Sequence, residues 1–463
     1  MRIILLLIFT GVAANALTLD DYMHQVAKKN KLLASYDLSI EASNDRQEAG
    51  DLALSPLLTA AYSETKDKSL PSAVADERDT AVTSLGLSKK FSTGTQLSLT
   101  ANTFRYNYLL PVVPGTPGYS KGGVGLSLTQ SLWKDFFGAA TRLRHQRESS
   151  TNKFETLNVE LKRRLAEIEY ESDFWDYIVS IEDKKLKQSN YDRAKKLESW
   201  TANRVSNGIS DDSDLLQVKA LTARRELELA AVNDDLKSKE VKIRQNLDLS
   251  AAEAFPEFTA NLTDARPYIT ELAKQKNIIK LDAYLNSLDA DVKQTLAEEV
   301  NESLLPDLSV TGQYNTSSYD LDHSTMQNNL TKTDRPVTYV GVNFSWMFGS
   351  DAKSAQLSAA RKEALAAQYR AQQSKVAGEE AWTEYLRKYE IAKENVLTLE
   401  RIAKLQSDRS KSEQQKFTKG RTITSNVVNA ITDSAEAEVS YLRAKSGLRK
   451  LEAGTLLFKS IAE

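Results

Sequence analysis

Few side chains in this 463-residue chain have the types and spacing that catalysis or metal binding would need. The chain contains no cysteine, which excludes disulfides, thiolate metal sites and a cysteine nucleophile. Its three histidines (His24, His145 and His323) lie far apart, and none belongs to a ligand-spaced motif. The sequence shows no phosphate-binding loop and no ordered Ser-His-Asp set. We therefore expect no enzyme, no metal site and no cofactor.

Two short segments, each built around a glycine, repeat each other in outline. In each segment the glycine is followed by a short linker and then by the start of a new helix. Glycine suits the positive-φ residue that commonly ends a helix, and acidic residues near a helix N-terminus are stabilised by the macrodipole. We expect two tight turns here, with Ser210 as an N-cap. The first segment holds Gly208, Ile209, Ser210 and Asp214, and the second holds Gly420, Arg421, Thr422, Asn426 and Asn429.

The elements around the two turns form two similar halves, each with the order helix, strands, very long helix, turn and helix. Residues 139–205 show one helical pattern without proline or glycine, and at 1.5 Å per residue they would form a rod about 100 Å long. A helix of that length favours coiled-coil packing. Neither half can bury its apolar faces alone, so the halves must pack side by side. We predict a first repeat at 17–247, a linker at 248–267 and a second repeat at 268–463.

Shorter helices and alternating strands complete each half. Pro56 and Pro306 end the helix that precedes the strands, and each long helix follows the last strand. The sequence predicts helices over 19–54, 268–305 and 351–417, and one helix after each glycine turn, ending near Leu247 and Ile461. It predicts strands over 57–63, 81–91, 96–102, 124–132, 308–314 and 340–348, and a polar loop over 317–336.

Residues 1–16 are expected to be a secretory signal peptide. Arg2 supplies the positive start, residues 3–12 the short apolar stretch, and Ala14-Asn15-Ala16 a cleavage site. The apolar run is short for a membrane anchor, and no later stretch approaches the ~20 apolar residues of a transmembrane helix. The net charge of −2 does not suggest nucleic-acid binding.

The strands alternate apolar with small polar residues and end in aromatic residues, which is typical of a membrane β-barrel with an aromatic girdle. The alternative is an ordinary sheet that covers the helices and buries its tryptophans. A barrel in lipid must close, so a chain with so few strands would have to share its wall with other copies. The 81–102 hairpin either adds two wall strands or folds elsewhere. The predicted girdle consists of Trp133, Phe136, Trp346 and Phe348.

These features together resemble the TolC family of outer-membrane channel-tunnels. The resemblance covers residues 19–458 and is sharpest at 204–216 and 416–422. It implies a homotrimer with a shared β-barrel in the outer membrane of a Gram-negative bacterium and an α-helical tunnel across the periplasm. It implies passive export in a tripartite efflux pump or a type I secretion system, with a periplasmic adaptor and an inner-membrane transporter as partners. The turns at Gly208–Ser210 and Gly420–Thr422 would form the closed end and contact the adaptor.

The resemblance also assigns a pore constriction. The family often carries acidic residues six and nine positions after the second turn glycine, where this chain has Asn426 and Asn429. Asp214 occupies the first-half position and matches. Each residue also has a plain interpretation, since Asp214 could serve only the helix dipole and the asparagines could be ordinary polar residues. The functional alternative is a coiled-coil structural protein of the cell envelope that forms no channel.

Overall fold

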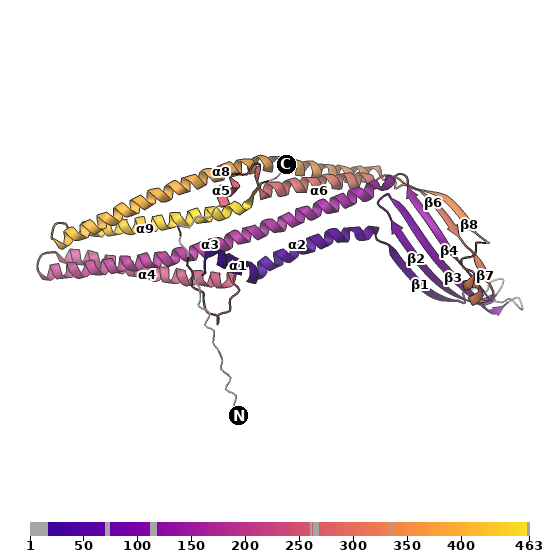
Figure 1. Ribbon diagram of the computed structural model, residues 1–463, viewed down its shortest axis with the longest axis horizontal. Coiled ribbons are helices and arrows are strands. Elements are labelled where there is room, and N and C mark those ends of the chain that lie inside the picture. The colour runs from indigo at the N-terminus through magenta and orange to yellow at the C-terminus, as the bar shows by residue number, and fades with distance from the viewer. Residues whose placement is uncertain are drawn as a thin grey trace, which may run out of the picture. The chain divides into compact units, whose positions relative to one another are not determined.

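The computed structural model of this protein describes residues 17–69, 75–111, 118–259, 262, 268–333 and 335–460. Figure 1 shows long helices and one large antiparallel sheet. The predicted signal peptide, residues 1–16, lies outside the described residues. Two compact units each take segments from both halves of the sequence, so the division into repeats stays a prediction. The helical unit comprises Met1–Glu41, Leu157–Tyr284 and Gln373–Glu463, and the sheet unit comprises Ala42–Thr156 and Leu285–Gln372.

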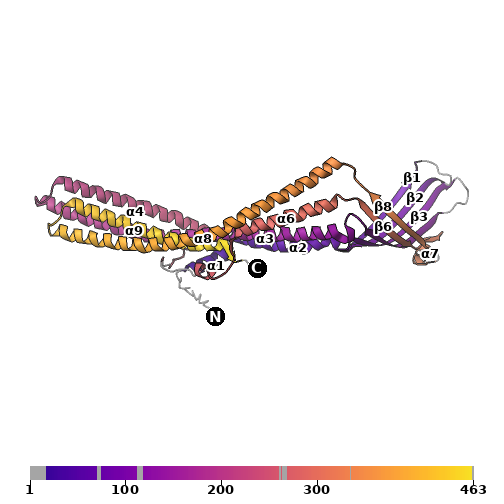
Figure 2. The same cartoon turned by 90° about the horizontal axis from the view of Figure 1, so that it is seen from above.

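Two antiparallel helix pairs lie side by side in the helical unit (Figures 1 and 2). In each pair a very long helix reverses at a glycine turn into a shorter helix, as the sequence predicts. Side-chain contacts hold each pair together: Ser180 donates to Asp235 over 2.9 Å, and Arg409 donates to Asp433 over 2.8 Å. The first pair consists of α3 (Ala139–Ser206) and α4 (Asp212–Asn246), and the second of α8 (Ser350–Thr418) and α9 (Thr424–Ala453).

The helix predicted over residues 19–54 is interrupted at Asn30. Its backbone is extended at φ −70° and ψ 119°, which ends α1 (Leu19–Lys29) before α2 (Lys31–Ala49) begins. The Asn30 Oδ1 atom accepts hydrogen bonds from the amides of Leu32 and Leu33, so this side chain caps the new helix. Its amide nitrogen donates to the carbonyl of Asn246 at the end of α4. The sequence-based helix was too long because a cap residue inside an apolar pattern was missed.

The helix predicted over residues 268–305 is likewise two helices. A short strand, β5 (Ile278–Lys280), separates α5 (Tyr268–Leu272) from α6 (Leu281–Ser303). The strand β9 (Phe458–Ser460) pairs antiparallel with β5. It follows the 3₁₀ helix η3 (Gly454–Leu457). The last helix therefore ends at Ala453, earlier than predicted. Phe458 anchors this return by packing on Trp382 and Tyr385.

One antiparallel sheet dominates the sheet unit, with the strand order β1-β2-β3-β4-β6-β8. The short strand β7 also pairs with β4, and its register with β4 is the same as that of β6. Every predicted strand is present, and most are longer than predicted. The strands are β1 (Leu57–Asp67), β2 (Ala75–Lys90), β3 (Thr95–Pro111), β4 (Tyr119–Ser131), β6 (Asp307–Asn315), β7 (Ser318–Asp320) and β8 (Val337–Ser345).

The segment predicted as a polar loop over 317–336 contains both β7 and a short helix, α7 (His323–Asn328). Asp322 caps α7 by accepting a hydrogen bond from the Thr325 amide. The Met326 side chain is fully buried, and a Cβ atom on Gly122 of β4 would lie within 3.0 Å of its sulfur. The prediction missed α7 because this six-residue helix carries a single apolar residue, which gives almost no periodic signal.

Helix segments of the sheet unit contact one another through polar side chains. Arg46 of α2 pairs with Glu155 of α3 at 3.0 Å, and Lys293 of α6 pairs with Glu363 of α8 at 3.3 Å. Short 3₁₀ turns, η1 (Gly50–Leu54) and η2 (Phe136–Gly138), connect helices and strands. In the part of the chain that the structure describes, no helix is both long and apolar enough to cross a membrane.

Candidate functional site: the glycine turns and the aliphatic sheet face

The two glycine turns have the same backbone geometry. Gly208 has φ 68° and Gly420 has φ 69°, both in the left-handed region that favours glycine. At the first turn, the Gly208 amide donates to the Val205 carbonyl and the Ile209 amide donates to the Arg204 carbonyl. Hydrogen bonds at the corresponding positions close the second turn. Each long helix therefore ends in a Schellman motif, the arrangement that a glycine at this position commonly makes.

The residues after the first glycine differ slightly from the prediction. Asp211, not Ser210, is the N-cap residue of α4, and its side chain makes no capping hydrogen bond. The Ser210 hydroxyl instead donates to the Asp214 carboxylate over 2.6 Å. Asp214 lies in the first turn of α4, where the helix dipole favours a negative charge. Asp214 thus stabilises the start of α4 within a single chain. A role in a pore would require other copies of the chain.

After the second glycine, three predicted site residues are exposed. Arg421, Asn426 and Asn429 all lie at the surface of the helical unit. Asn426 and Asn429 are three residues apart in α9, so they occupy one face of the helix. The Thr422 hydroxyl donates to Glu413 over 2.9 Å, and hydrogen bonds from Lys416 and Thr422 hold the pKa of Glu413 below its usual value. The Asn426 amide nitrogen donates to the Thr422 hydroxyl over 3.3 Å, and both side chains of this asparagine face are exposed.

One contact between the two turns was not predicted. The Arg204 Nη1 atom donates to the Phe417 carbonyl over 3.0 Å, and the guanidinium carbon lies 4.6 Å from the centre of the Phe417 ring. Phe417 is buried in a cluster that α3, α4, α8 and α9 share. Both residues lie within the resemblance motifs, but only the packing of the two pairs reveals their contact. The cluster consists of Ala194, Leu197, Val218, Leu221, Phe417, Val427 and Ile431.

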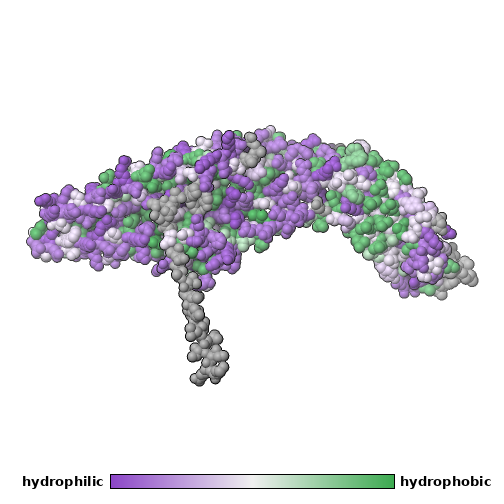
Figure 3. Space-filling model, in the orientation of Figure 1, coloured by the Kyte–Doolittle hydropathy of each residue, from purple (hydrophilic) through white to green (hydrophobic). Residues whose placement is uncertain are grey.

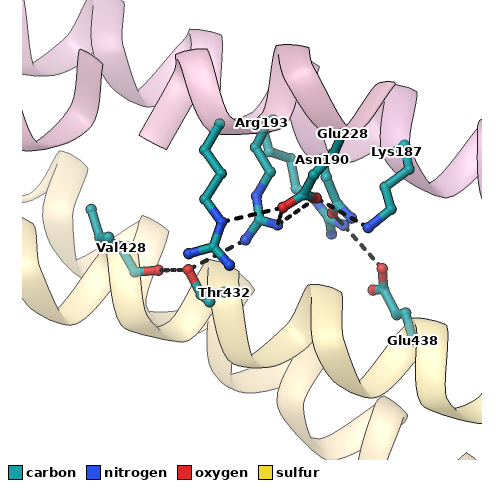
Figure 4. Close-up of polar contacts among 9 residues, drawn as sticks. Lys187, Asn190, Arg193, Glu228, Val428, Thr432 and Glu438 are labelled. Carbon is teal, nitrogen blue, oxygen red and sulfur yellow. Dashed lines mark hydrogen bonds and ion pairs between the residues drawn. The ribbon is translucent and has the colours of Figure 1, made fainter. Parts of the chain in front are cut away.

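A polar network joins the two helix pairs further from the turns (Figure 4). The buried Arg225 side chain donates to both oxygens of Glu228 and to the Thr432 hydroxyl of α9. Arg193 pairs with Glu438 of α9 at 3.2 Å. Burial would raise the pKa of Glu228, but hydrogen bonds from Arg225 and Lys187 hold it below its usual value. The first pair is thus fastened to the second by charged groups that are largely screened from water.

The sheet has one aliphatic face and one polar face. Strand pairing places Leu58, Leu87, Leu99 and Leu126 on the same face of four neighbouring strands. Serine, threonine and glycine predominate opposite, including Ser88, Ser98 and Ser127 in one row. Figure 3 shows hydrophobic surface gathered over the strands. The aliphatic face consists mainly of Leu58, Ala60, Leu85, Leu87, Leu97, Leu99, Val124, Leu126, Leu128, Leu308, Val310, Val340, Val342 and Phe344.

This aliphatic face is exposed in the single chain. Val340 is 80% exposed and Val342 69%, values that large aliphatic residues of a soluble sheet rarely reach over a contiguous area. The girdle residues follow β4 and β8 directly, and Trp133 and Trp346 are 46% and 48% exposed. The alternative of a covering sheet with buried tryptophans is therefore wrong. Such a face needs an apolar solvent or a partner.

An aromatic cluster on the polar face was missed by the sequence interpretation. The Tyr119 ring centre lies 4.8 Å from that of Tyr106 and 5.0 Å from that of Tyr319. The Lys121 ammonium group lies 5.2 Å from the centre of the Phe104 ring. These residues come from β3, β4 and β7, so the cluster depends on strand register. In the sequence, the alternating aromatic residues Phe104 and Tyr106 were a sign of this cluster.

The fold defined by these elements is that of the outer-membrane channels. No protein-family model and no curated protein sequence matches the chain. Solved structures share the single-chain fold that the TolC-family resemblance predicted, whereas the closed barrel, the trimer and the repeats stay predictions.

Three of these structures illustrate the likeness. The outer-membrane channel OprN is 15% identical, with a TM-score of 0.66, and the match covers 95% of this chain and 89% of that one. The outer membrane protein VceC from Vibrio cholerae is 12% identical, with a TM-score of 0.67 and coverage of 95% of both chains. The open state of the MtrE outer membrane channel from Neisseria gonorrhoeae is 13% identical, with a TM-score of 0.63 and coverage of 95% and 88%. The match extends over nearly the whole chain, so it includes both units.

Proposed function

We propose that this protein is a passive export duct: three copies share a β-barrel in the outer membrane of a Gram-negative bacterium, and their helices form a tunnel across the periplasm. The observation that carries the proposal is the sheet with one exposed aliphatic face and one polar face. Such a sheet is stable in lipid only if its edges are paired and its polar face lines a wet interior. The likeness to outer-membrane channels over 95% of the chain supports the same conclusion.

The glycine turns form the closing end of the duct in this proposal. Three copies of the asparagine face, Asn426 and Asn429, would surround one axis together with Asp214. Arg421 carries a charge beside the turn and would pair with a neighbouring copy. The turn residues Gly208, Ile209, Ser210, Gly420, Arg421 and Thr422 would contact a periplasmic adaptor, which joins the duct to an inner-membrane transporter. The duct would serve a tripartite efflux pump or a type I secretion system.

Planar-bilayer recording tests the proposal directly. Purified protein should insert into bilayers and give discrete conductance steps, and light scattering in detergent should give the mass of a trimer. The rival function, a coiled-coil structural protein of the envelope, predicts no conductance at any protein concentration. A water-soluble monomer that remains monodisperse without detergent would exclude the duct.

A further inference from the structure

The two outer strands of the sheet have open edges. Among the described residues, β1 pairs only with β2 and β8 pairs only with β6. Both strands are exposed along almost their whole length, whereas the inner strand β6 is half-buried except at Tyr314. Unpaired backbone groups on such edges are costly in hydrocarbon, where no water can satisfy them. If the sheet lies in a membrane, something must therefore pair with both edges.

A second copy of the chain fits these edges. β1 starts after the helix η1 and β8 ends before α8, so β8 of one copy beside β1 of the next continues the antiparallel alternation. Aligning the ends at which the two strands meet their helices places Leu57 opposite Ser345. The same alignment sets Ala60 opposite Val342, which brings the aliphatic faces together. A contact between different edges of identical copies closes into a ring when its rotation allows.

The β2–β3 hairpin belongs to this wall. Its two strands lie between β1 and β4. β2 pairs with β1, and β3 pairs with β4, each in an unbroken register. Its apolar residues lie on the same face as those of the neighbouring strands, with Leu87 opposite Leu99. Since β7 continues the line of β6 beside β4, the described part of each copy supplies six strand positions. A hairpin folded elsewhere would have left β1 and β4 as neighbours.

We propose that the three copies seal an eighteen-stranded wall by pairing β8 of each copy with β1 of the next. This inference rests on the proposed trimeric duct and adds its strand number and its seam. With strands about 4.8 Å apart and tilted by about 40°, eighteen strands enclose a barrel about 36 Å across between backbones. The twelve strands that β1, β4, β6 and β8 alone would supply enclose about 24 Å. The added hairpin widens the mouth about 1.5-fold.

Cysteine cross-linking tests the seam, because the chain has no native cysteine and every thiol pair is unambiguous. The variant carrying Ala60→Cys and Val342→Cys, oxidised in native outer membranes, should run as a covalent trimer without reductant and as a monomer with it. Leu58→Cys and Tyr62→Cys, each with Val342→Cys, cover a register shifted by one pair. The matched control is Ala61→Cys with Val342→Cys, whose side chains point to opposite faces and should not link. Absence of any β1–β8 link in a trimer would overturn the seam.

A second pair tests the hairpin. Ala60 and Val124 occupy one row, connected through Leu85 and Ala101, so about 14 Å separates them when β2 and β3 lie between. That distance is too long for a disulfide. The variant with Ala60→Cys and Val124→Cys should therefore form no internal disulfide. Formation of that disulfide, or a trimer image with twelve strands, would overturn the eighteen-stranded wall while leaving the duct intact. A monomer in detergent would instead overturn the proposed function.

Discussion

Arg204 and Phe417 connect the two glycine turns of the chain within a single copy. The Arg204 guanidinium donates to the Phe417 carbonyl over 3.0 Å and lies 4.6 Å from the centre of its ring. The Phe417 carbonyl lies in the last turn of α8, at the negative end of the helix dipole, and also accepts a hydrogen bond from the Gly420 amide. One side chain thus combines a charge-assisted hydrogen bond, a cation–π contact and a favourable dipole. We expect this contact to keep the turns together when the duct is closed.

Replacing Arg204 with alanine should loosen the second turn. The charge-assisted hydrogen bond and the cation–π contact together are worth about 1–3 kcal/mol. Amides after Phe417 should exchange hydrogen faster by roughly 5- to 150-fold. The bilayer conductance should rise if the turns close the duct. Lys419→Ala is the control, because Lys419 is exposed beside the same turn. Equal exchange rates in both variants would show that the contact carries no stability.

Gly420→Val should strain the second turn without filling any space. A Cβ atom there meets no atom within 4 Å, so the cost comes from the φ of 69° alone. A β-branched residue in the left-handed region costs about 1–2 kcal/mol or more. We expect export to fall more than thermal stability, because a side chain at Gly420 meets no buried residue of the neighbouring cluster. Gly447→Val is the matched control, since Gly447 is helical and also has open space around it. Dissociation of the trimer by Gly420→Val would contradict this expectation.

Asn426→Asp with Asn429→Asp should increase cation preference. Both side chains are exposed on one face of α9, and three copies around one axis would give two negative rings. The measurement is the reversal potential in a salt gradient. Asn426→Gln with Asn429→Gln controls for changes of side-chain size. An unchanged reversal potential in the aspartate variant would place this face outside the pore.

Acidification should weaken the link between α3 and α4 that Glu228 makes with Lys187. Its pKa is held below the ordinary value by Arg225 and Lys187, so the folded state favours the charged carboxylate. The resulting stability is fully present above the unfolded pKa of about 4.3, and it is lost as the pH falls through the lower folded value. Thermal unfolding between pH 3 and pH 7 should show this loss. Glu228→Gln should be less stable near pH 7 and should lose less stability on acidification; parallel curves would exclude the link.

Local sequence determined the long helices, the turns and the strand pattern of this protein. The pattern over residues 139–205 lacks proline and glycine, and the structure extends α3 from Ala139 to Ser206. Gly208 and Gly420 predicted turns because only glycine adopts positive φ without strain. Strict alternation predicted which strand residues share a face. Each of these features is set by neighbours along the chain.

Tertiary structure decided the breaks, the hairpin and the contacts between the turns. Asn30 caps the second of two helices, and its amide nitrogen also donates to the carbonyl of Asn246, a partner 216 residues away. The 81–102 hairpin lies in the sheet because β2 pairs with β1 along one edge and with β3 along the other. Arg204 meets Phe417 only after two helix pairs pack together. These outcomes depend on interactions with residues distant in sequence. A local sequence pattern carries no information on the free energy of such interactions.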